Sequence, residues 1–342
     1  MQKREKTFSY KKCAIVCLLI VAPLLLAFAA LAMGRFPLSL QTVFQVLAAK
    51  ISGAVPIDLQ TEKVIWGIRL PRILLAMLVG AGLAVSGLAF QNLFSNPLAT
   101  PDTLGVASGA SFGAVLALLF GLNLLWVQLL ALIGGVLAVS LTYSVSANRD
   151  RGSITTVVLA GLIIGSLFTA LVSLVKYVAD AESQLPSIVY WLMGSLSSAN
   201  YRMLLLGAPL ILIGIIVLLL LRWRLNLLPL TEDEARSAGV NISHLRLLTV
   251  ISATMITASC VSMCGQVGWV GLLVPHMCRM LFGGNNQKLV PACISLGAML
   301  MLIVDTMART VSAGEIPVSI LTAIIGAPVF IVLLRRTGGW SL

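Results

Sequence analysis

The sequence predicts an all-α membrane protein built from about ten helices that cross the bilayer. Hydrophobic residues make up 59% of its 342 residues and charged residues only 10%, whereas about a quarter of a soluble chain is charged. Long uncharged stretches recur, such as residues 73–90 and 203–221. A helix needs roughly 20 apolar residues to cross a hydrocarbon core about 30 Å thick, and its backbone must form its hydrogen bonds internally. Repeated stretches of this length therefore predict a bundle of transmembrane helices.

The first apolar stretch, residues 13–34, follows a basic cluster at residues 3–12. It is longer than the apolar core of a signal peptide, and further apolar stretches follow it. We therefore interpret it as a retained transmembrane helix. Because Lys and Arg collect on the cytoplasmic side, the tail formed by residues 1–12 is predicted to be cytoplasmic.

The other spans are separated by polar or proline-containing breaks. The uncharged stretch 247–278 is long enough for more than one crossing, and GQVGWVG (265–271) is expected to divide it. All spans form one transmembrane domain, residues 13–336, followed by a cytoplasmic tail, residues 337–342. The ten expected spans are residues 13–34, 71–94, 103–121, 124–147, 154–178, 203–221, 247–265, 269–282, 289–311 and 316–334.

Two polar segments are expected on the outer side. Residues 35–68 are predicted to form an outer loop with a short surface helix. Residues 179–202 are predicted to form an interfacial helix, since Tyr190 and Trp191 suit a membrane boundary. This topology places fifteen of the 23 Lys and Arg residues inside and eight outside, with both termini in the cytoplasm. The positive-inside bias explains the net charge of +11 without a nucleic-acid partner.

Groups that could drive chemistry are scarce within the spans. Asp305 and Arg309 are four residues apart on one predicted helix, a spacing typical of a structural ion pair. Ion-driven transporters place carboxylates or unwound sites near the middle of the membrane, and we find no such set. The phosphate-binding pattern GxxxxGK[ST] is absent. The six Cys residues lie in apolar runs without a CxxC pair, and His244 and His276 are isolated, so no metal site is expected.

Four regions stand out, each with two interpretations. Arg69, Arg72 and Arg309 lie at outer ends of spans, where they could dock an acidic partner or interact with lipid headgroups. The inner loop, residues 225–246, reads as two short helices and could contact a soluble partner or simply connect two spans. In this loop Thr231 and Glu234 would form a capping box.

The other two regions belong to the second span and the turn that follows it. The turn SNPLATPD (95–102) is rigid because of its prolines, and could be a gate or an ordinary turn. Small residues give the second span a surface that predicts either close helix packing or a lining for a pathway. These residues are Gly80, Gly82, Ala84, Ser86 and Gly87.

Several segments, in order, resemble the iron-chelate and vitamin B12 permeases of bacterial ATP-binding cassette (ABC) importers. The likeness covers nearly all of the chain after residue 60. The segments are RLPRILLAMLVGAGLAVSGLAFQNLFSNPLATPDTLGVASGASFGA from residue 69, LAG (159–161), YWLMGSLSS (190–198), LTEDEARSAGVN (230–241), GWVGLLVPHMCRML (268–281) and EIPVSILTAIIGAPVFIVLLRR (315–336).

The resemblance implies a type II ABC importer permease, a non-catalytic subunit of ten helices in the bacterial cytoplasmic membrane. Such a subunit pairs with a second copy of itself, or with a close paralogue. Two cytoplasmic ATP-binding cassette subunits bind below the pair, and a substrate-binding protein docks outside. The chain itself is expected to bind no cofactor, since ATP and Mg²⁺ would belong to the partner ATPase.

The resemblance also assigns roles to particular residues. Arg69, Arg72 and Arg309 match basic residues that meet glutamates of the binding protein. Thr231 departs from the family pattern, which has glycine before the acidic residue. The core of the inner loop that couples to the ATPase is Glu232, Asp233, Glu234, Arg236 and Gly239. The inner end of the pathway is Asn96, Pro97 and Leu98, and a second constriction is Ser153, Ile154 and Thr155.

Cargo and function class leave alternatives. A ferric siderophore is the first expectation for the cargo, with haem and cobalamin as alternatives within the same family. An ion-coupled secondary transporter is the alternative from another class, and it would need its own ion-coupling groups. A membrane enzyme acting on lipids would need clustered His, Asp or Glu at one membrane surface, which the sequence does not offer.

Overall fold

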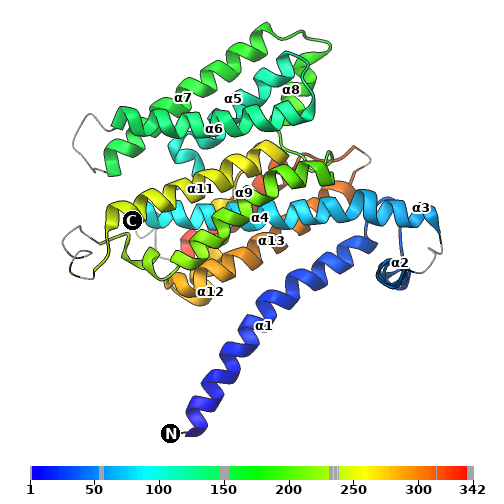
Figure 1. The fold of residues 1–342 in the computed structure, drawn as a ribbon, viewed down its shortest axis with the longest axis horizontal. Coiled ribbons are helices and arrows are strands. Elements are labelled where there is room, and N and C mark those ends of the chain that lie inside the picture. Colours follow the sequence, from blue (N-terminus) through cyan, green and yellow to red (C-terminus); the bar gives the residue numbers. More distant parts are fainter. Residues whose placement is uncertain are drawn as a thin grey trace.

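The computed structural model describes residues 2–53, 58–146, 154–230, 234, 237, 239–312 and 314–336. These residues form helices joined by turns and loops. Within these residues there is no strand, which confirms the predicted all-α class (Figure 1). In chain order the longer helices are α1 (Gln2–Ala32), α2 (Leu40–Ser52), α4 (Leu70–Leu93), α5 (Val106–Leu119), α6 (Leu124–Ser146), α7 (Ile154–Val178), α8 (Gln184–Leu192), α9 (Tyr201–Leu221), α11 (Ile242–Cys264), α12 (Val270–Phe282), α13 (Asn286–Thr310) and α14 (Val318–Arg336). Short helical pieces are α3 (Leu59–Glu62), the π-helix η1 (Lys63–Arg69) and the 3₁₀ turns η2 (Pro101–Leu104) and η3 (Arg224–Leu227).

Each of the ten predicted spans coincides with a helix, but the helices differ in length. Six described helices are long and apolar enough to cross a membrane, and four apolar helices are shorter. α5 has 14 residues and α12 has 13, so they are roughly 20 Å long at 1.5 Å per residue. That is less than the roughly 30 Å hydrocarbon core, so the number of complete crossings is only approximately ten.

Helix α4 forms the centre of the bundle. It lies among α9, α11 and α13 (Figure 1), and its Leu75, Val79, Leu88 and Phe90 are buried. Small residues allow this close approach, because a Cβ added at Gly80 would lie 2.2 Å from the Gly297 carbonyl oxygen of α13. The predicted small-residue surface of this span therefore serves helix packing within the chain.

Helices α5, α6, α7 and α8 form a second layer, seen above α11 in Figure 1. α5 and α6 are the members of this layer that pack on α11. Their own contact is again close, since a Cβ added at Gly109 would lie 2.4 Å from the Gly134 carbonyl oxygen. α7 lies on the outside of the layer, and its Leu159, Ile163 and Leu174 are exposed in the single chain.

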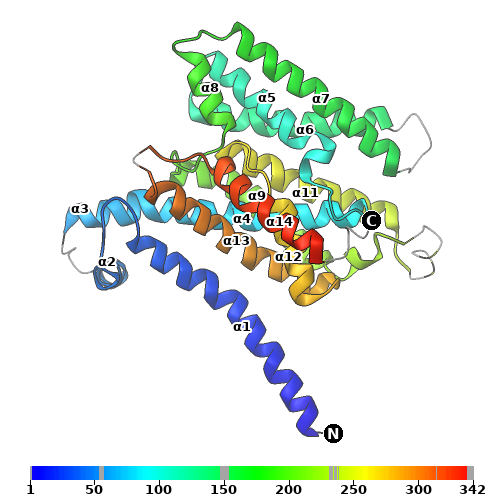
Figure 2. The same cartoon turned by 180° about the vertical axis from the view of Figure 1, so that it is seen from behind.

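Helix α1 begins at Gln2 and therefore includes most of residues 1–12, which the sequence analysis treats as a separate tail. The helix can continue through these residues because Lys, Arg, Glu and Gln are good helix formers, whereas hydropathy marks only the apolar part. α1 meets the other helices near its C-terminal end, mainly at α13. Figure 2 shows its N-terminal half leaving the body of the molecule.

The predicted outer loop is more helical than expected. α2 and α3 occupy it, and the chain then runs through η1 into α4, so the helix containing the second span begins at Leu59 and not at 71. Pro71 has no N–H, and in a regular α-helix its ring conflicts with the carbonyl four residues earlier. The wider π-helical turns of η1 lie just before Pro71, where this conflict would arise. Asp58 caps α3 by accepting from the backbone N–H groups of Gln60 and Thr61 at 3.0 and 3.1 Å. It also accepts from the Thr61 hydroxyl at 2.6 Å, and this bond and the backbone bonds lower the pKa of Asp58.

The long uncharged stretch is broken where GQVGWVG predicts a break. α11 ends at Cys264, α12 begins at Val270, and both Gly265 and Trp269 have positive φ angles of 73° and 67°. There is also no room for a side chain at Gly265, because a Cβ there would lie 2.2 Å from the Trp191 carbonyl oxygen. The predicted interfacial helix at 179–202 is present as α8.

Candidate functional site

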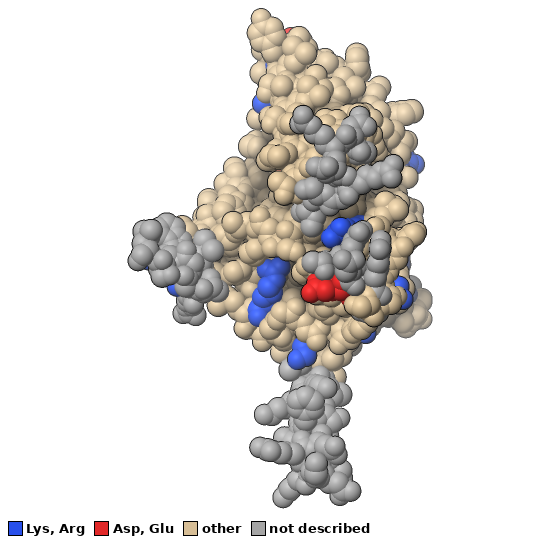
Figure 3. Space-filling view, turned by 90° about the vertical axis from the view of Figure 1, so that its left-hand side faces the viewer, with Lys and Arg blue, Asp and Glu red and all other residues tan. Residues whose placement is uncertain are grey.

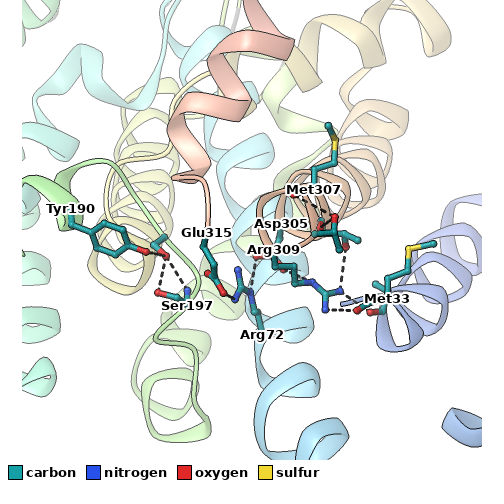
Figure 4. A network of polar contacts seen from close by, with 12 residues as sticks. Met33, Arg72, Tyr190, Ser197, Asp305, Met307, Arg309 and Glu315 are labelled. Atoms are coloured by element: carbon teal, nitrogen blue, oxygen red, sulfur yellow. Dashed lines mark hydrogen bonds and ion pairs between the residues drawn. The ribbon is translucent and has the colours of Figure 1, made fainter. Parts of the chain in front are cut away.

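Arg72 lies in a buried ionic cluster at one end of α4. Its Nε lies 2.9 Å from Asp305 Oδ1 in α13, and its Nη1 lies 2.9 Å from Glu315 Oε1 in the segment before α14. The Asp305 side chain is fully buried and the Glu315 side chain is 25% exposed. Figure 4 shows Arg72 between these two carboxylates. The guanidinium fork thus joins three elements that are far apart in the sequence.

Arg309 completes the cluster and connects it to α1. Its Nε lies 3.7 Å from Asp305 Oδ2, which confirms the ion pair predicted from the i, i+4 spacing. Its Nη1 donates to the Met33 carbonyl at 2.7 Å, and its Nη2 donates to the Ala30 carbonyl at 2.7 Å (Figure 4). The last carbonyls of a helix have no partner within it, so Arg309 caps the C-terminal end of α1.

Arg69 binds the same end of α1. Its guanidinium donates to the carbonyls of Leu31 and Phe36. Gly34 leaves room for it, because a Cβ at that position would lie 2.8 Å from Arg69 Nη2, and the φ of Gly34 is +151°. The three predicted docking arginines are therefore brought together, but each is less than 10% exposed in this chain and bonded to the chain's own oxygens.

The opposite end of α4 carries the predicted pathway turn. The Asn96 side chain accepts a hydrogen bond from Leu98 N at 2.9 Å, and Asn96 N donates to the Gln91 carbonyl at 3.1 Å. These bonds hold the turn in one conformation, and its prolines predict such a rigid turn. Pro97 and Leu98 are exposed, with Leu98 at 55%. Of the second predicted constriction, Thr155 is exposed in the first turn of α7. Ile154 begins that helix, while Ser153 lies outside the described residues.

The coupling loop is described in part. Glu232, Asp233 and Arg236 lie outside the described residues, as does the expected cap Thr231. Ser237 Oγ donates to the Glu234 carbonyl at 2.8 Å, and Gly239 has a φ of +73°. Asn241 caps α11 by accepting from His244 N at 3.1 Å, so the second helix expected in the loop is the first part of α11, which continues to Cys264.

Figure 3 views the molecule from the end where the coupling loop and the α4 turn lie, and its surface shows more basic than acidic side chains. The described basic residues of this end include Arg222, Arg224, Lys288 and Arg335, all exposed. Such an end is typical of the cytoplasmic side of a membrane protein.

An asparagine cluster at this end was not anticipated from the sequence. Asn286, 2% exposed at the start of α13, exchanges side-chain hydrogen bonds with Asn92 of α4 at 3.0 and 3.2 Å. The Asn226 side chain in η3 accepts from Asn286 N at 2.9 Å. Asn226 lies at the start of the inner loop and Asn92 precedes the pathway turn, so the cluster connects the segments that carry the two predicted sites. The three asparagines come from segments far apart in the sequence, which therefore carries no signal for the cluster.

A cavity of about 410 Å³ lies between α4, η2, α5, α11 and the start of α14. Its wall is mixed, with Leu83 and Val261 beside the polar side chains of Asp102, Gln266 and Ser319. Trp269, which precedes α12, also lines it.

The sequence profile of the FecCD transport family matches residues 19–336. The chain belongs to the FecCD transport family. It is therefore the multi-pass permease subunit of an ABC importer, a kind of subunit that works with an ATPase and a substrate-binding protein. This confirms the family resemblance drawn from the sequence motifs.

Two relatives and one solved structure show the range of the family. The chain is 45% identical to the molybdate import system permease protein MolB of Haemophilus influenzae, over 90% of each chain. It is 40% identical to a probable iron chelatin transport system permease protein of Helicobacter pylori, over 81% of this chain and 83% of that one. A putative metal-chelate type ABC transporter in an inward-facing conformation matches with a TM-score of 0.86 and 42% identity, covering 94% of this chain and 99% of that chain.

Proposed function

We propose that this FecCD permease pairs with a second copy of itself and that the two copies enclose a pathway for a metal chelate, with a ferric siderophore as the first candidate. The family match over residues 19–336 carries the proposal. The described ionisable residues lie mainly at the ends of the helices, so the walls between the ends are mostly uncharged. Uncharged walls suit a bulky cargo whose recognition belongs to the external binding protein.

A molybdate oxyanion is the second candidate cargo, because the molybdate permease of H. influenzae is 45% identical to this chain. Haem and cobalamin remain the alternatives that the family resemblance offers. Because the candidate cargoes differ in size and charge, uptake assays with the assembled importer separate them.

Uptake into liposomes tests the proposed function. The permease, its ATPase and its binding protein are reconstituted together, and accumulation of ⁵⁵Fe-siderophore is compared with accumulation of ⁹⁹Mo-molybdate. We expect siderophore uptake that requires ATP hydrolysis and survives the loss of ion gradients. Molybdate uptake alone would overturn the siderophore assignment. Accumulation by the permease alone, driven by an ion gradient, would favour a secondary transporter and overturn the proposal as a whole.

We further propose that the arginine cluster docks acidic residues of the binding protein. The charges of the cluster support this role, because its three guanidinium groups face only two carboxylates, those of Asp305 and Glu315. Burial raises the energetic cost of an unbalanced charge, so an approaching carboxylate would be stabilised here. The coupling loop at the opposite end would then bind the ATPase, through Glu232, Asp233, Glu234, Arg236 and Gly239.

Neutralising Arg69 and Arg309 tests the docking proposal. We expect the double variant Arg69→Gln/Arg309→Gln to weaken binding of the cognate binding protein by at least about tenfold, because removing one partner of a buried charge pair costs about 2 kcal/mol or more. Surface plasmon resonance on permease–ATPase complexes in nanodiscs measures the affinity. Arg202→Gln, an exposed arginine at the start of α9, is the control and should change the affinity little. An unchanged affinity in the double variant would refute docking at this cluster.

A further inference from the structure

We propose that Glu315 is an internal competitor for Arg72, which an acidic residue of the external binding protein displaces on docking. The inference rests on the docking function proposed for the arginine cluster and adds a residue to which no role has been assigned. It makes docking an exchange of one carboxylate for another at Arg72.

The two carboxylates that bind Arg72 are held differently. Asp305 is fully buried in the middle of the cluster, between Arg72 and Arg309. Glu315 lies in the connection between α13 and α14, and its side chain is 25% exposed. Its Oε1 lies 2.9 Å from Arg72 Nη1, while its Oε2 is buried without a hydrogen-bond partner. Glu315 is therefore the less firmly held carboxylate, because it pairs with one arginine where Asp305 pairs with two, and it is the more exposed of the two.

Charge balance explains why one carboxylate can replace another at Arg72. With Glu315 in place the cluster has three guanidinium groups and two carboxylates, and without it the ratio would be three to one. An unpaired buried charge is strongly unfavourable, so Glu315 leaves only if another carboxylate takes its place. An external glutamate or aspartate can do so, because Arg presents several N–H donors in a fixed fork.

Release of Glu315 from Arg72 would also affect the segment that leads to the cavity wall. Ile316 N donates to the Ala308 carbonyl at 3.2 Å, and Val318 N donates to the Gly194 carbonyl at 3.0 Å. The next residue, Ser319, lies in the first turn of α14 and lines the 410 Å³ cavity. Release of Glu315 thus acts on a short segment bonded to α13 on one side and leading directly into α14 on the other.

Affinity measurements on permease–ATPase complexes in nanodiscs test the competition. We expect Glu315→Gln to lower the Kd for the cognate binding protein about three- to tenfold, the range of a partly exposed charge pair. Glu315→Asp should also lower the Kd, because the shorter side chain retracts from Arg72 while keeping its charge. In an Arg72→Lys background, where the fork is lost, Glu315→Gln should change the Kd less than about twofold.

Glu182→Gln is the matched control, since Glu182 is an exposed glutamate in the connection between α7 and α8. If it lowers the Kd as much as Glu315→Gln does, general charge repulsion explains the effect and the competition is refuted. If Glu315→Gln and Glu315→Asp leave the Kd unchanged while Arg69→Gln/Arg309→Gln weakens binding, docking stands and the competition alone fails. If none of the variants changes the Kd, the docking function itself is wrong.

Discussion

Gly80 shows how the absence of a side chain determines the packing of two helices. A Cβ at Gly80 would lie 2.2 Å from the Gly297 carbonyl oxygen, and a Cβ at Gly297 would lie 2.4 Å from the Gly80 carbonyl oxygen. Both atoms belong to backbone, which cannot turn aside as a flexible side chain can. The two glycines therefore fix the separation of α4 and α13, and with it the position of Asp305 relative to Arg72.

We expect Gly80→Ala to destabilise the protein by about 1–3 kcal/mol, because the added methyl group forces α4 and α13 apart. The thermal unfolding midpoint of the protein in nanodiscs measures the effect. Gly67→Ala is the control, since nothing lies within 4 Å of a Cβ at Gly67. Equal midpoints for the two variants would show that the α4–α13 contact tolerates the extra atom.

At the scale of elements, the asparagine pair joins helices that the chain separates by almost two hundred residues. Asn92 and Asn286 exchange hydrogen bonds at 3.0 and 3.2 Å, and the backbone N–H of Asn286 donates to Asn226. The pair thereby holds the end of α4 against the start of α13, beside the turn η3 at the start of the inner loop.

A double-mutant cycle tests this contact. We expect Asn286→Leu and Asn92→Leu each to cost about 1–3 kcal/mol of stability, because each leaves a partly buried amide without its partner. The double variant should recover part of the loss, since it removes both amides together. Thermal unfolding of the three variants gives the interaction energy. Additive losses would mean that the two amides do not stabilise each other.

The sequence predicts the elements better than the contacts between them. Hydropathy locates all ten apolar helices, because each contains a long uncharged run, and GQVGWVG marks the break between α11 and α12. It misplaces the start of the helix containing Pro71, since a π-helical segment precedes the proline and hydropathy does not register it. The place of Arg69, Arg72 and Arg309 at outer ends of spans groups these three residues in the sequence. Glu315 is not in that group, because pairing across elements depends on the fold and not on local spacing. The same reason hides the asparagine cluster.

At the scale of the whole molecule, charge differs between the two ends of the bundle. Among the described residues, the end viewed in Figure 3 exposes more basic than acidic side chains. The end with the arginine cluster also carries acidic residues, including Asp58, Asp180 and Glu315. By the positive-inside rule we expect the coupling end to lie in the cytoplasm, on the side of the ATPase.

Reporter fusions test this orientation. We expect green fluorescent protein fused after Leu342 to fluoresce and alkaline phosphatase fused there to be inactive, because the C-terminus would be cytoplasmic. Fusions in the connection between α7 and α8, at Glu182, should give the reverse pattern. An active phosphatase at the C-terminus would invert the proposed topology and place the coupling loop outside.

Helix α1 is held by the rest of the chain mainly at its C-terminal end, and much of its apolar surface is left uncovered by the chain. Two arginines fasten its C-terminal end, while Val16, Leu24 and Leu25 along the helix are 55%, 58% and 64% exposed in the single chain. An apolar surface of this kind is expected to contact lipid or a partner subunit, since few groups of the chain itself cover it. We therefore expect the two guanidinium groups to hold one end of the helix, while the surrounding membrane supports the rest.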